Sequence, residues 1–401
     1  MIEETNSIVP ERSYSRFVSG PAIVLYIVAF KLLLHLLTVN RYGIFRDEMY
    51  YLACSRHMAW GYVDHPPLTV WVAWLSRHVL GDSLLAVRLF PILTGAALVW
   101  LTGKLAREMG GGRFAQALSA FAVVVVPIYL VGGSWLTDNI FEQLIWMGCV
   151  WLVIRAINSA GVEDPKAARY WFWFGVLAGF GFENKYSIAF LLLGLFTGVA
   201  LTPHRHFLNS RYLWLGVLAC AVIALPNLLW QVHYHFPFLE LIHNIRLANR
   251  DVVRGPVAFI ADQATIMNPI LFPLWVGGVI WLFIGKNTTR EDHGANKAPG
   301  SAGRYRLLGW TFLVVLTTFI AMKAKNYYVV PIYPMLFAAG AIGLERITQG
   351  RRAGTGGRGI WVRSIYVALV IAVGALLLPF SVPVLSPENY LRYQKALGMT
   401  P

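Results

Sequence analysis

Apolar segments of membrane-spanning length recur along the whole chain and are separated by polar stretches. A window of about 20 apolar residues is long enough to cross the hydrocarbon core of a bilayer as a helix. The candidate spans are residues 20–39, 84–104, 114–133, 138–157, 170–182, 186–201, 212–230, 264–285, 306–322, 327–345 and 360–380. The pattern therefore predicts an all-α integral membrane protein with about eleven transmembrane helices, formed by residues 1–401 as a single polytopic domain.

Composition narrows the class further. Hydrophobic residues make up 57% of the 401 residues, charged residues only 13%, and the mean hydropathy is +0.56. These values exclude an ordinary soluble domain. A net charge of +14 could indicate a nucleic-acid partner, but the cations lie between spans on one side, as the positive-inside rule requires. We therefore expect membrane lipids and no nucleic acid as partners.

The same rule orients the chain. Placing the N-terminal segment inside makes every second gap cytoplasmic, and all five such gaps contain cations. Examples, one for each gap, are Arg107, Lys166, Arg205, Arg290 and Arg352. Residues 346–401 then form a cytoplasmic basic loop, a last span and a short exterior tail. Residues 68–80, which are Trp-rich and amphipathic, should lie along the membrane interface.

The exterior gaps contain most of the unusual polar groups. Asp47 and Glu48 follow the first span, and Asp64 and His65 come about 17 residues later, after several aromatic residues. Further polar positions of interest are Asp138, Asn184, Lys185, Lys323, Lys325, Tyr327 and Tyr328. Carboxylates gathered at one water–lipid boundary suit acid–base chemistry or ion binding. The pattern indicates an active site facing the outer leaflet.

Simpler structural roles stay open for these residues. Asp47 and Glu48 could cap a helix, and Asp138 is an N-cap candidate after Thr137. Lys185 could form a surface ion pair with Glu183. Lys323 and Lys325 could extend along apolar surface to the membrane interface. These alternatives predict helix ends and ion pairs without catalysis.

No cofactor is predicted with certainty. Cys149 and Cys220 fall inside spans and Cys54 outside them, so no disulfide pair or structural metal site is indicated. Asp64 and His65 could contribute to a divalent metal site.

Several motifs together resemble glycosyltransferase family 39, which includes protein O-mannosyltransferases and lipid A aminoarabinose transferases. The first is Phe45-Arg-Asp-Glu-Met-Tyr-Tyr-Leu-Ala, followed by Trp60-Gly-Tyr-Val-Asp-His-Pro-Pro-Leu. Later ones are Asp82-Ser-Leu-Leu-Ala-Val-Arg-Leu-Phe-Pro, Thr137-Asp, Asn184-Lys-Tyr-Ser and Asn326-Tyr-Tyr-Val-Val-Pro-Ile-Tyr-Pro. The resemblance covers about residues 20–345. Asp64-His65-Pro-Pro stands where the family also has Glu-Lys-Pro-Pro.

The resemblance implies the GT-C membrane fold and an inverting transfer of a sugar from a polyprenyl-phosphate donor. A lipid, glycan or protein would be the acceptor, at the periplasmic face of a bacterial inner membrane. Asp47 would be the base, with Glu48 beside it, and Asp64 would shape the acceptor or metal region. The remaining polar candidates would bind the donor phosphate or substrate, and they are His65, Asp138, Asn184, Lys185, Lys323, Lys325, Tyr327 and Tyr328.

A transporter or flippase of a lipid-linked or anionic substrate is the rival interpretation. Transporters place charged groups near the bilayer midplane on broken helices, and many contain inverted repeats. Here the charges gather at one face and the two halves of the sequence do not resemble each other. The sequence therefore favours the transferase.

Overall fold

The computed structural model describes residues 16–159, 169–248, 254–285, 303–349 and 356–399. Within these ranges every regular element is a helix. The predicted cytoplasmic cations Lys166, Arg290 and Arg352 lie outside the described residues.

The longest helices are α1 (Gly20–Thr38), α4 (Leu84–Glu108), α7 (Asp138–Ser159), α10 (Arg211–His233), α15 (Tyr333–Gln349) and α16 (Gly356–Leu377). The shorter α-helices are α2 (Arg46–Cys54), α3 (Leu68–Leu80), α5 (Arg113–Val125), α6 (Pro127–Ser134), α8 (Arg169–Asn184), α9 (Ile188–Ala200), α11 (Pro237–Leu247), α12 (Pro256–Ile266), α13 (Phe272–Ile284), α14 (Arg306–Ala321) and α17 (Pro387–Ala396). The 3₁₀ turns are η1 (Arg16–Val18), η2 (Pro203–Asn209), η3 (Pro269–Leu271), η4 (Asn326–Ile332) and η5 (Leu378–Phe380).

The predicted all-α membrane architecture is confirmed, and every predicted span coincides with helical structure. Among the described residues, six helices are long and apolar enough to cross a membrane, or nine if three bent pairs each count as one span. One bent pair is α5 with α6, which turns by 67° where Pro127 follows the break at Val126. The other two predicted spans are α8 and α14, which have only 16 residues each. The predicted number of about eleven therefore requires these two short helices to cross as well.

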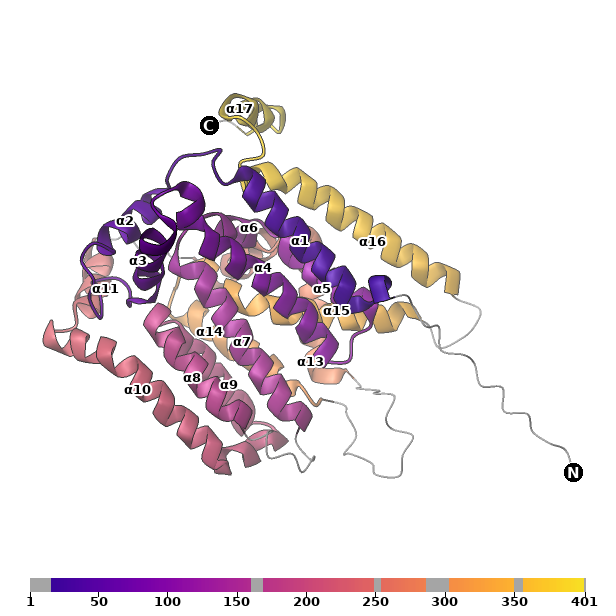
Figure 1. Ribbon diagram of the computed structural model, residues 1–401. Coiled ribbons are helices and arrows are strands. Elements are labelled where there is room, and N and C mark those ends of the chain that lie inside the picture. Colours follow the sequence, from indigo (N-terminus) through magenta and orange to yellow (C-terminus); the bar gives the residue numbers. More distant parts are fainter. Residues whose placement is uncertain (1–15, 160–168, 249–253, 286–302, 350–355, 400–401) are drawn as a thin grey trace, which may run out of the picture.

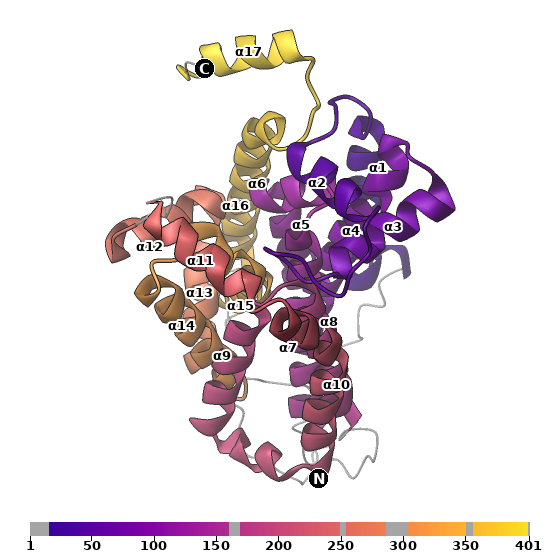
Figure 2. The same ribbon diagram turned by 90° about the vertical axis from the view of Figure 1, so that its left-hand side faces the viewer.

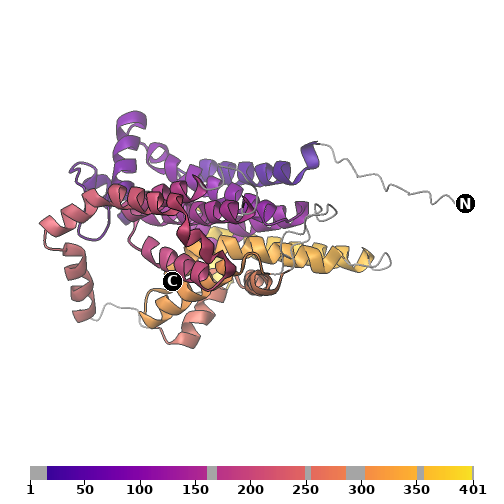
Figure 3. The same ribbon diagram turned by 90° about the horizontal axis from the view of Figure 1, so that it is seen from below.

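The long helices run alongside one another between the two ends of the molecule (Figure 3). Helix α8 packs between α7 and α10 (Figure 1). Its contact with α10 is closest at Gly175, where a Cβ atom would collide with the carbonyl group of Gly216. Such a close approach of two helices is what the four-residue spacing of Gly175 and Gly179 permits.

One end of the bundle gathers the short elements α2, α3 and α11, the start of α7 and the turn between α8 and α9 (Figure 1). The C-terminal segment also reaches this end, where α17 lies beyond the bundle (Figure 2). Arg41 donates to the carbonyl of Val384 at 2.7 Å, and the Tyr42 hydroxyl donates to that of Leu385 at 3.3 Å. The segment that leads into α2 is thus attached to the last part of the chain.

Candidate active site

Helix α2 begins with two carboxylates that have opposite environments. Asp47 is on its outer side, with 45% of its side chain exposed and one oxygen 3.1 Å from Arg46 Nε. Glu48 is fully buried. It is the third residue of the helix, and its Oε2 accepts the Phe45 N–H at 2.8 Å, which caps the helix start.

The Glu48 carboxylate is saturated by donors. Arg88 on α4 donates to it through Nε and Nη2 at 2.9 and 2.8 Å, and the Leu136 N–H donates at 3.2 Å. Arg88 is 3% exposed and also donates to the Val39 carbonyl. Because both of its carboxylate oxygens accept these hydrogen bonds, Glu48 joins α2 to α4 and to residue 136. We infer that it is a positioning residue, and its predicted catalytic place beside Asp47 stays a prediction.

Asp64 faces α2 from the following loop. The Tyr50 hydroxyl donates to Asp64 Oδ1 at 2.5 Å. Burial, and then the hydrogen bond to Asp64, raise the pKa of Tyr50 well above its ordinary value. Tyr50 therefore stays protonated and orients Asp64, which keeps 43% of its side chain exposed.

His65 is buried among aromatic rings, including those of Tyr50, Tyr51 and Tyr62. Its Nδ1 lies 2.8 Å from the carbonyl oxygen of the next residue, and its Nε2 lies 3.8 Å from Asp64 Oδ1. Asp64 and His65 could provide two metal ligands. Among the described residues, no group of three His, Cys, Asp or Glu side chains gathers around one point. A divalent metal at this pair stays a prediction.

Lys185 connects the start of α7 to the turn that follows α8. Its Nζ lies 2.6 Å from Asn139 Oδ1, 3.1 Å from Glu142 Oε2 and 3.5 Å from Asp138 Oδ2. Burial lowers the pKa of Lys185, but the two carboxylates outweigh burial, so this pKa is raised above its ordinary value of 10.5. Lys185 is therefore an ammonium ion. The predicted alternative of an ion pair with Glu183 is wrong, because its partners are on α7.

Sequence reasoning missed Glu142 and its partner Ser187. Glu142 is buried on α7, and the Ser187 hydroxyl donates to it. A usable signal was present, because Glu142 is four residues after Asp138 and so lies on the same helix face.

Two residues join the Asp64 region to the Lys185 region. Asn184 accepts a hydrogen bond from the Thr69 hydroxyl at 3.2 Å and donates to the Asp138 carbonyl at 2.9 Å. The buried Tyr51 is the second. Burial raises the pKa of Tyr51, and the charges of Asp138, Asp64 and Asp47 contribute to this rise. The charges of three carboxylates predicted to share a site thus act on Tyr51.

Turn η4 brings the predicted tyrosine pair to the same place. Lys185 Nζ lies 5.4 Å from the centroid of the Tyr328 ring, and the rings of Tyr327 and Tyr328 are 5.0 Å apart. Lys325 Nζ lies 5.9 Å from the Tyr327 ring. Lys325 and Lys323 are exposed, and Lys323 has a left-handed φ of 53°. Lys325 therefore lies beside the tyrosine pair, and Lys323 is exposed on the segment that leads into η4.

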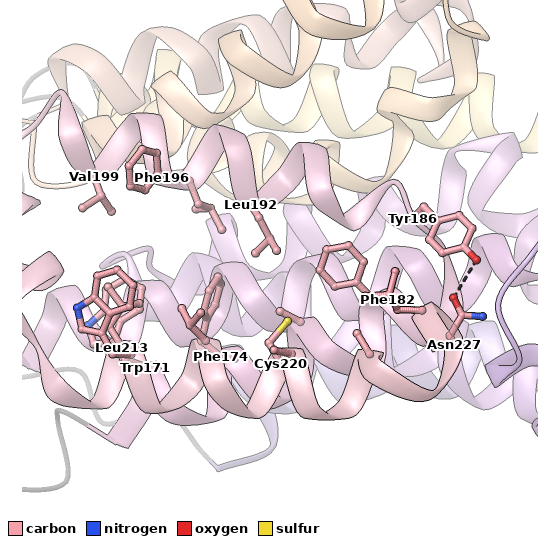
Figure 4. A pocket seen from close by; sticks show the side chains of 18 of the residues that line it. Trp171, Phe174, Phe182, Tyr186, Leu192, Phe196, Val199, Leu213, Cys220 and Asn227 are labelled. Carbon is pink, nitrogen blue, oxygen red and sulfur yellow. Dashed lines mark hydrogen bonds between the residues drawn. The ribbon is translucent and has the colours of Figure 1, made fainter. Parts of the chain in front are cut away.

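A long apolar groove leads to this region. It has a volume of about 1070 Å³ and is lined by side chains of α8, α9, α10 and η2. Figure 4 shows Phe196 and Leu192 on one wall and Phe174 on the other. The groove could not be predicted from the sequence, because an apolar groove lining and a lipid-facing helix surface have the same composition until the position of α9 is known.

The groove has one polar end. There the Tyr186 hydroxyl donates to Asn227 Oδ1 at 2.8 Å (Figure 4) and accepts from Gln231 Nε2 at 3.0 Å. Burial raises the pKa of Tyr186 to about 12, so this hydroxyl remains a donor at neutral pH. Tyr186 is the neighbour of Lys185 in the chain. The groove therefore runs from apolar surface to a polar end formed by Tyr186, Asn227 and Gln231, an arrangement that suits a ligand with a long hydrocarbon chain and a polar head.

The chain is similar to several known proteins. Residues 64–230 match the family model described as dolichyl-phosphate-mannose-protein mannosyltransferase. The lipid A galacturonosyltransferase RgtD of Rhizobium johnstonii is 23% identical over 77% of this chain and 61% of its own length. The undecaprenyl phosphate-alpha-4-amino-4-deoxy-L-arabinose arabinosyl transferase 1 of Pseudomonas fluorescens is 29% identical over 54% of this chain and 39% of its own. The chain thus spans less than two thirds of the length of these relatives.

Solved structures show the same fold. ArnT from Cupriavidus metallidurans, bound to undecaprenyl phosphate, superposes with a TM-score of 0.65 at 18% identity, over 88% of this chain and 72% of that one. The oligosaccharyltransferase of Archaeoglobus fulgidus, in complex with zinc and sulfate, gives a TM-score of 0.58 at 15% identity, over 88% of this chain and 52% of its own. The predicted GT-C membrane fold and the predicted resemblance to glycosyltransferase family 39 are therefore both confirmed.

Proposed function

We propose that this protein is an inverting glycosyltransferase of the bacterial inner membrane. It moves a sugar from a polyprenyl-phosphate donor to an outer-leaflet lipid, glycan or protein on the periplasmic face. The observation that carries the proposal is the long apolar groove, whose polar end includes Tyr186, the residue that follows Lys185 in the chain. A solved neighbour bound to undecaprenyl phosphate and a relative named as a lipid A galacturonosyltransferase support it.

The donor chain lies in the groove, with its phosphate at the polar end. Lys185 alone is a weak phosphate site, because Asp138 and Glu142 together outweigh its charge. Lys323 and Lys325, exposed beside the tyrosine pair, provide the additional positive charge. A lysine ammonium is an effective point charge for phosphate. Lys185 then holds the cluster together, and the exterior lysines neutralise the leaving phosphate.

The sugar lies between the phosphate and the two exposed carboxylates, Asp47 and Asp64. Asp47 takes the proton from the acceptor hydroxyl as the acceptor oxygen bonds to the anomeric carbon. The bond between that carbon and the phosphate oxygen breaks, and its electron pair leaves with the phosphate. One displacement inverts the anomeric configuration. Asp64, held by Tyr50, orients the acceptor.

The test is turnover by the purified full-length protein with an undecaprenyl-phosphate sugar and membrane glycolipid acceptors, followed by mass spectrometry of the products. Asp47→Asn should lower turnover by roughly 10²–10⁴-fold, the usual effect of losing a general base. Donor affinity should be unchanged, because Asp47 is away from the groove. Asp82→Asn, at another exposed carboxylate that is paired with an arginine, is the matched control and should stay near wild type.

Comparison of glycolipids from cells with and without the gene identifies the acceptor in parallel. Turnover of Asp47→Asn within threefold of wild type would remove Asp47 as the base. If wild-type protein shows neither turnover nor binding of any polyprenyl-phosphate donor, the transferase proposal is wrong.

A further inference from the structure

A second groove lies between α13, α15 and α16. Its volume is about 780 Å³. Glycines form part of its lining, and a Cβ atom added at Gly277 would meet no atom within 4 Å, so this glycine faces open space. Around it, Ile284 and Ile347 are 69% and 81% exposed. Because these apolar side chains belong to membrane-embedded helices, the groove opens toward lipid rather than water.

One end of this groove carries hydrogen-bond donors. Arg346 contributes a guanidinium group 5.4 Å from the centroid of the Trp281 ring. Trp281 is 8% exposed, and its Nε1–H has no acceptor among the described residues. This N–H lies next to Gly285, where a Cβ atom would approach Nε1 to 2.8 Å. A buried N–H without an acceptor costs stability, so its place beside a cation points to an anionic ligand.

This donor end is far from the candidate active site. Helix α15 starts at Tyr333, just after η4, and Arg346 comes 13 residues later, about 20 Å along the axis. The adjacent Glu345 does not oppose an anion in the groove. It accepts hydrogen bonds from the backbone N–H groups of Gly112 and Phe114, at the start of α5. Its charge is therefore compensated on another side of α15.

We propose that this groove binds an anionic glycerophospholipid of the inner leaflet. The lipid phosphate accepts hydrogen bonds from Arg346 and from Trp281 Nε1–H, and one acyl chain lies over Gly277. Charge complementarity selects an anionic head group, and the exposed apolar rim selects a lipid rather than a soluble anion. The site is independent of the sugar-transfer proposal, since it shares no residue with the candidate active site.

The experiment is native mass spectrometry of the full-length protein titrated with dioleoylphosphatidylglycerol or with zwitterionic dioleoylphosphatidylcholine. Wild type should prefer the anionic lipid. Arg346→Gln and Trp281→Phe should each weaken its binding by about tenfold, the effect of one lost hydrogen bond to a charged group. Gly277→Leu should also weaken it, because the new side chain fills the groove while helix propensity improves.

Arg358→Gln is the matched control, because Arg358 is an exposed cation of the neighbouring α16 that does not line the groove. It should bind the anionic lipid like wild type. Equal losses in Arg358→Gln and Arg346→Gln would mean unspecific surface attraction and overturn the proposal. So would unchanged binding in Gly277→Leu, absence of any bound lipid, or displacement of the lipid by inorganic phosphate. Persistence of the bound lipid in excess inorganic phosphate supports it.

Discussion

Glu48 and Asp47 are neighbours in the chain, and substituting them should have opposite consequences. Glu48→Gln keeps the size of the side chain but removes its charge. One carboxylate oxygen that accepts hydrogen bonds would be replaced by an NH₂ group, which cannot accept them. Arg88 would then be a buried cation without a counter-charge. Asp47→Asn changes an exposed carboxylate that has only Arg46 beside it. The first substitution should therefore affect folding, and the second should affect turnover.

The magnitude follows from burial. Both members of the Glu48–Arg88 pair are almost inaccessible to solvent, and removing one partner of such a pair costs about 3–5 kcal/mol. The surrounding bonds to the Phe45 and Leu136 N–H groups are weakened as well. An exposed ion pair such as that of Asp47 contributes only about 0–1 kcal/mol. We expect the two variants to differ in unfolding free energy by at least about 2 kcal/mol.

The assay is reversible unfolding of the purified protein in mixed micelles of mild detergent and dodecyl sulfate, followed by tryptophan fluorescence. Turnover is measured on the same preparations at dodecyl sulfate concentrations below the unfolding transition. Glu48→Gln should unfold at lower denaturant and retain some activity per folded molecule. A variant as stable as wild type but inactive would show that Glu48 takes part in the chemistry and that its role as a positioning residue is wrong.

Three further outcomes can be measured. In a cysteine-free background, a cysteine at Asp64 should react with an impermeant thiol reagent from outside and one at Arg107 should not; the reverse pattern would invert the proposed orientation. The stability advantage of wild type over Lys185→Met should shrink as pH rises above 10.5, because the pKa of Lys185 is raised in the folded protein; an advantage that grows at high pH in denaturation curves would contradict this. Ala221→Trp, at an exposed position lining the long groove, should raise the KM for an undecaprenyl donor but not for a short-chain analogue; equal effects on both donors would argue against the groove as the site of the lipid chain.

The sequence predicted the helices well, because span length and hydrophobicity are local properties. The number of membrane-spanning helices could not be predicted, because α8 has the composition of a transmembrane helix but only 16 residues. The prediction also placed Asp64, Asp138 and Lys185 in one exterior region. In the structure Lys185 pairs with Asp138, and Asn184 donates to the Asp138 carbonyl group. Such gathering is predictable because loops on one side of a bilayer share one surface, whereas the exterior position of this region stays a prediction.

Other features depend on three-dimensional contacts that no single segment reveals. The motif that contains Asp47 and Glu48 makes the two carboxylates look equivalent. Only the position of Arg88, 40 residues later and inside an apolar span, shows that one of them is a structural anion. Lys185 similarly forms its ion pairs with residues of α7 and not with Glu183. Sequence neighbours are thus a poor guide to the partner of a buried charge.

The attachment of the C-terminal segment to Arg41 and Tyr42 has a consequence for the order in which the protein is assembled during synthesis. These hydrogen bonds join residues 343 positions apart. A nascent chain therefore inserts α1 and makes α2 long before Val384 and Leu385 leave the ribosome, and domains at the start of a chain generally fold before later ones. The connector in front of Asp47 acquires these two hydrogen bonds only after residues 384 and 385 have been synthesised. Until then it is held by Arg88, which donates to the carbonyl groups of Val39 and Gly43.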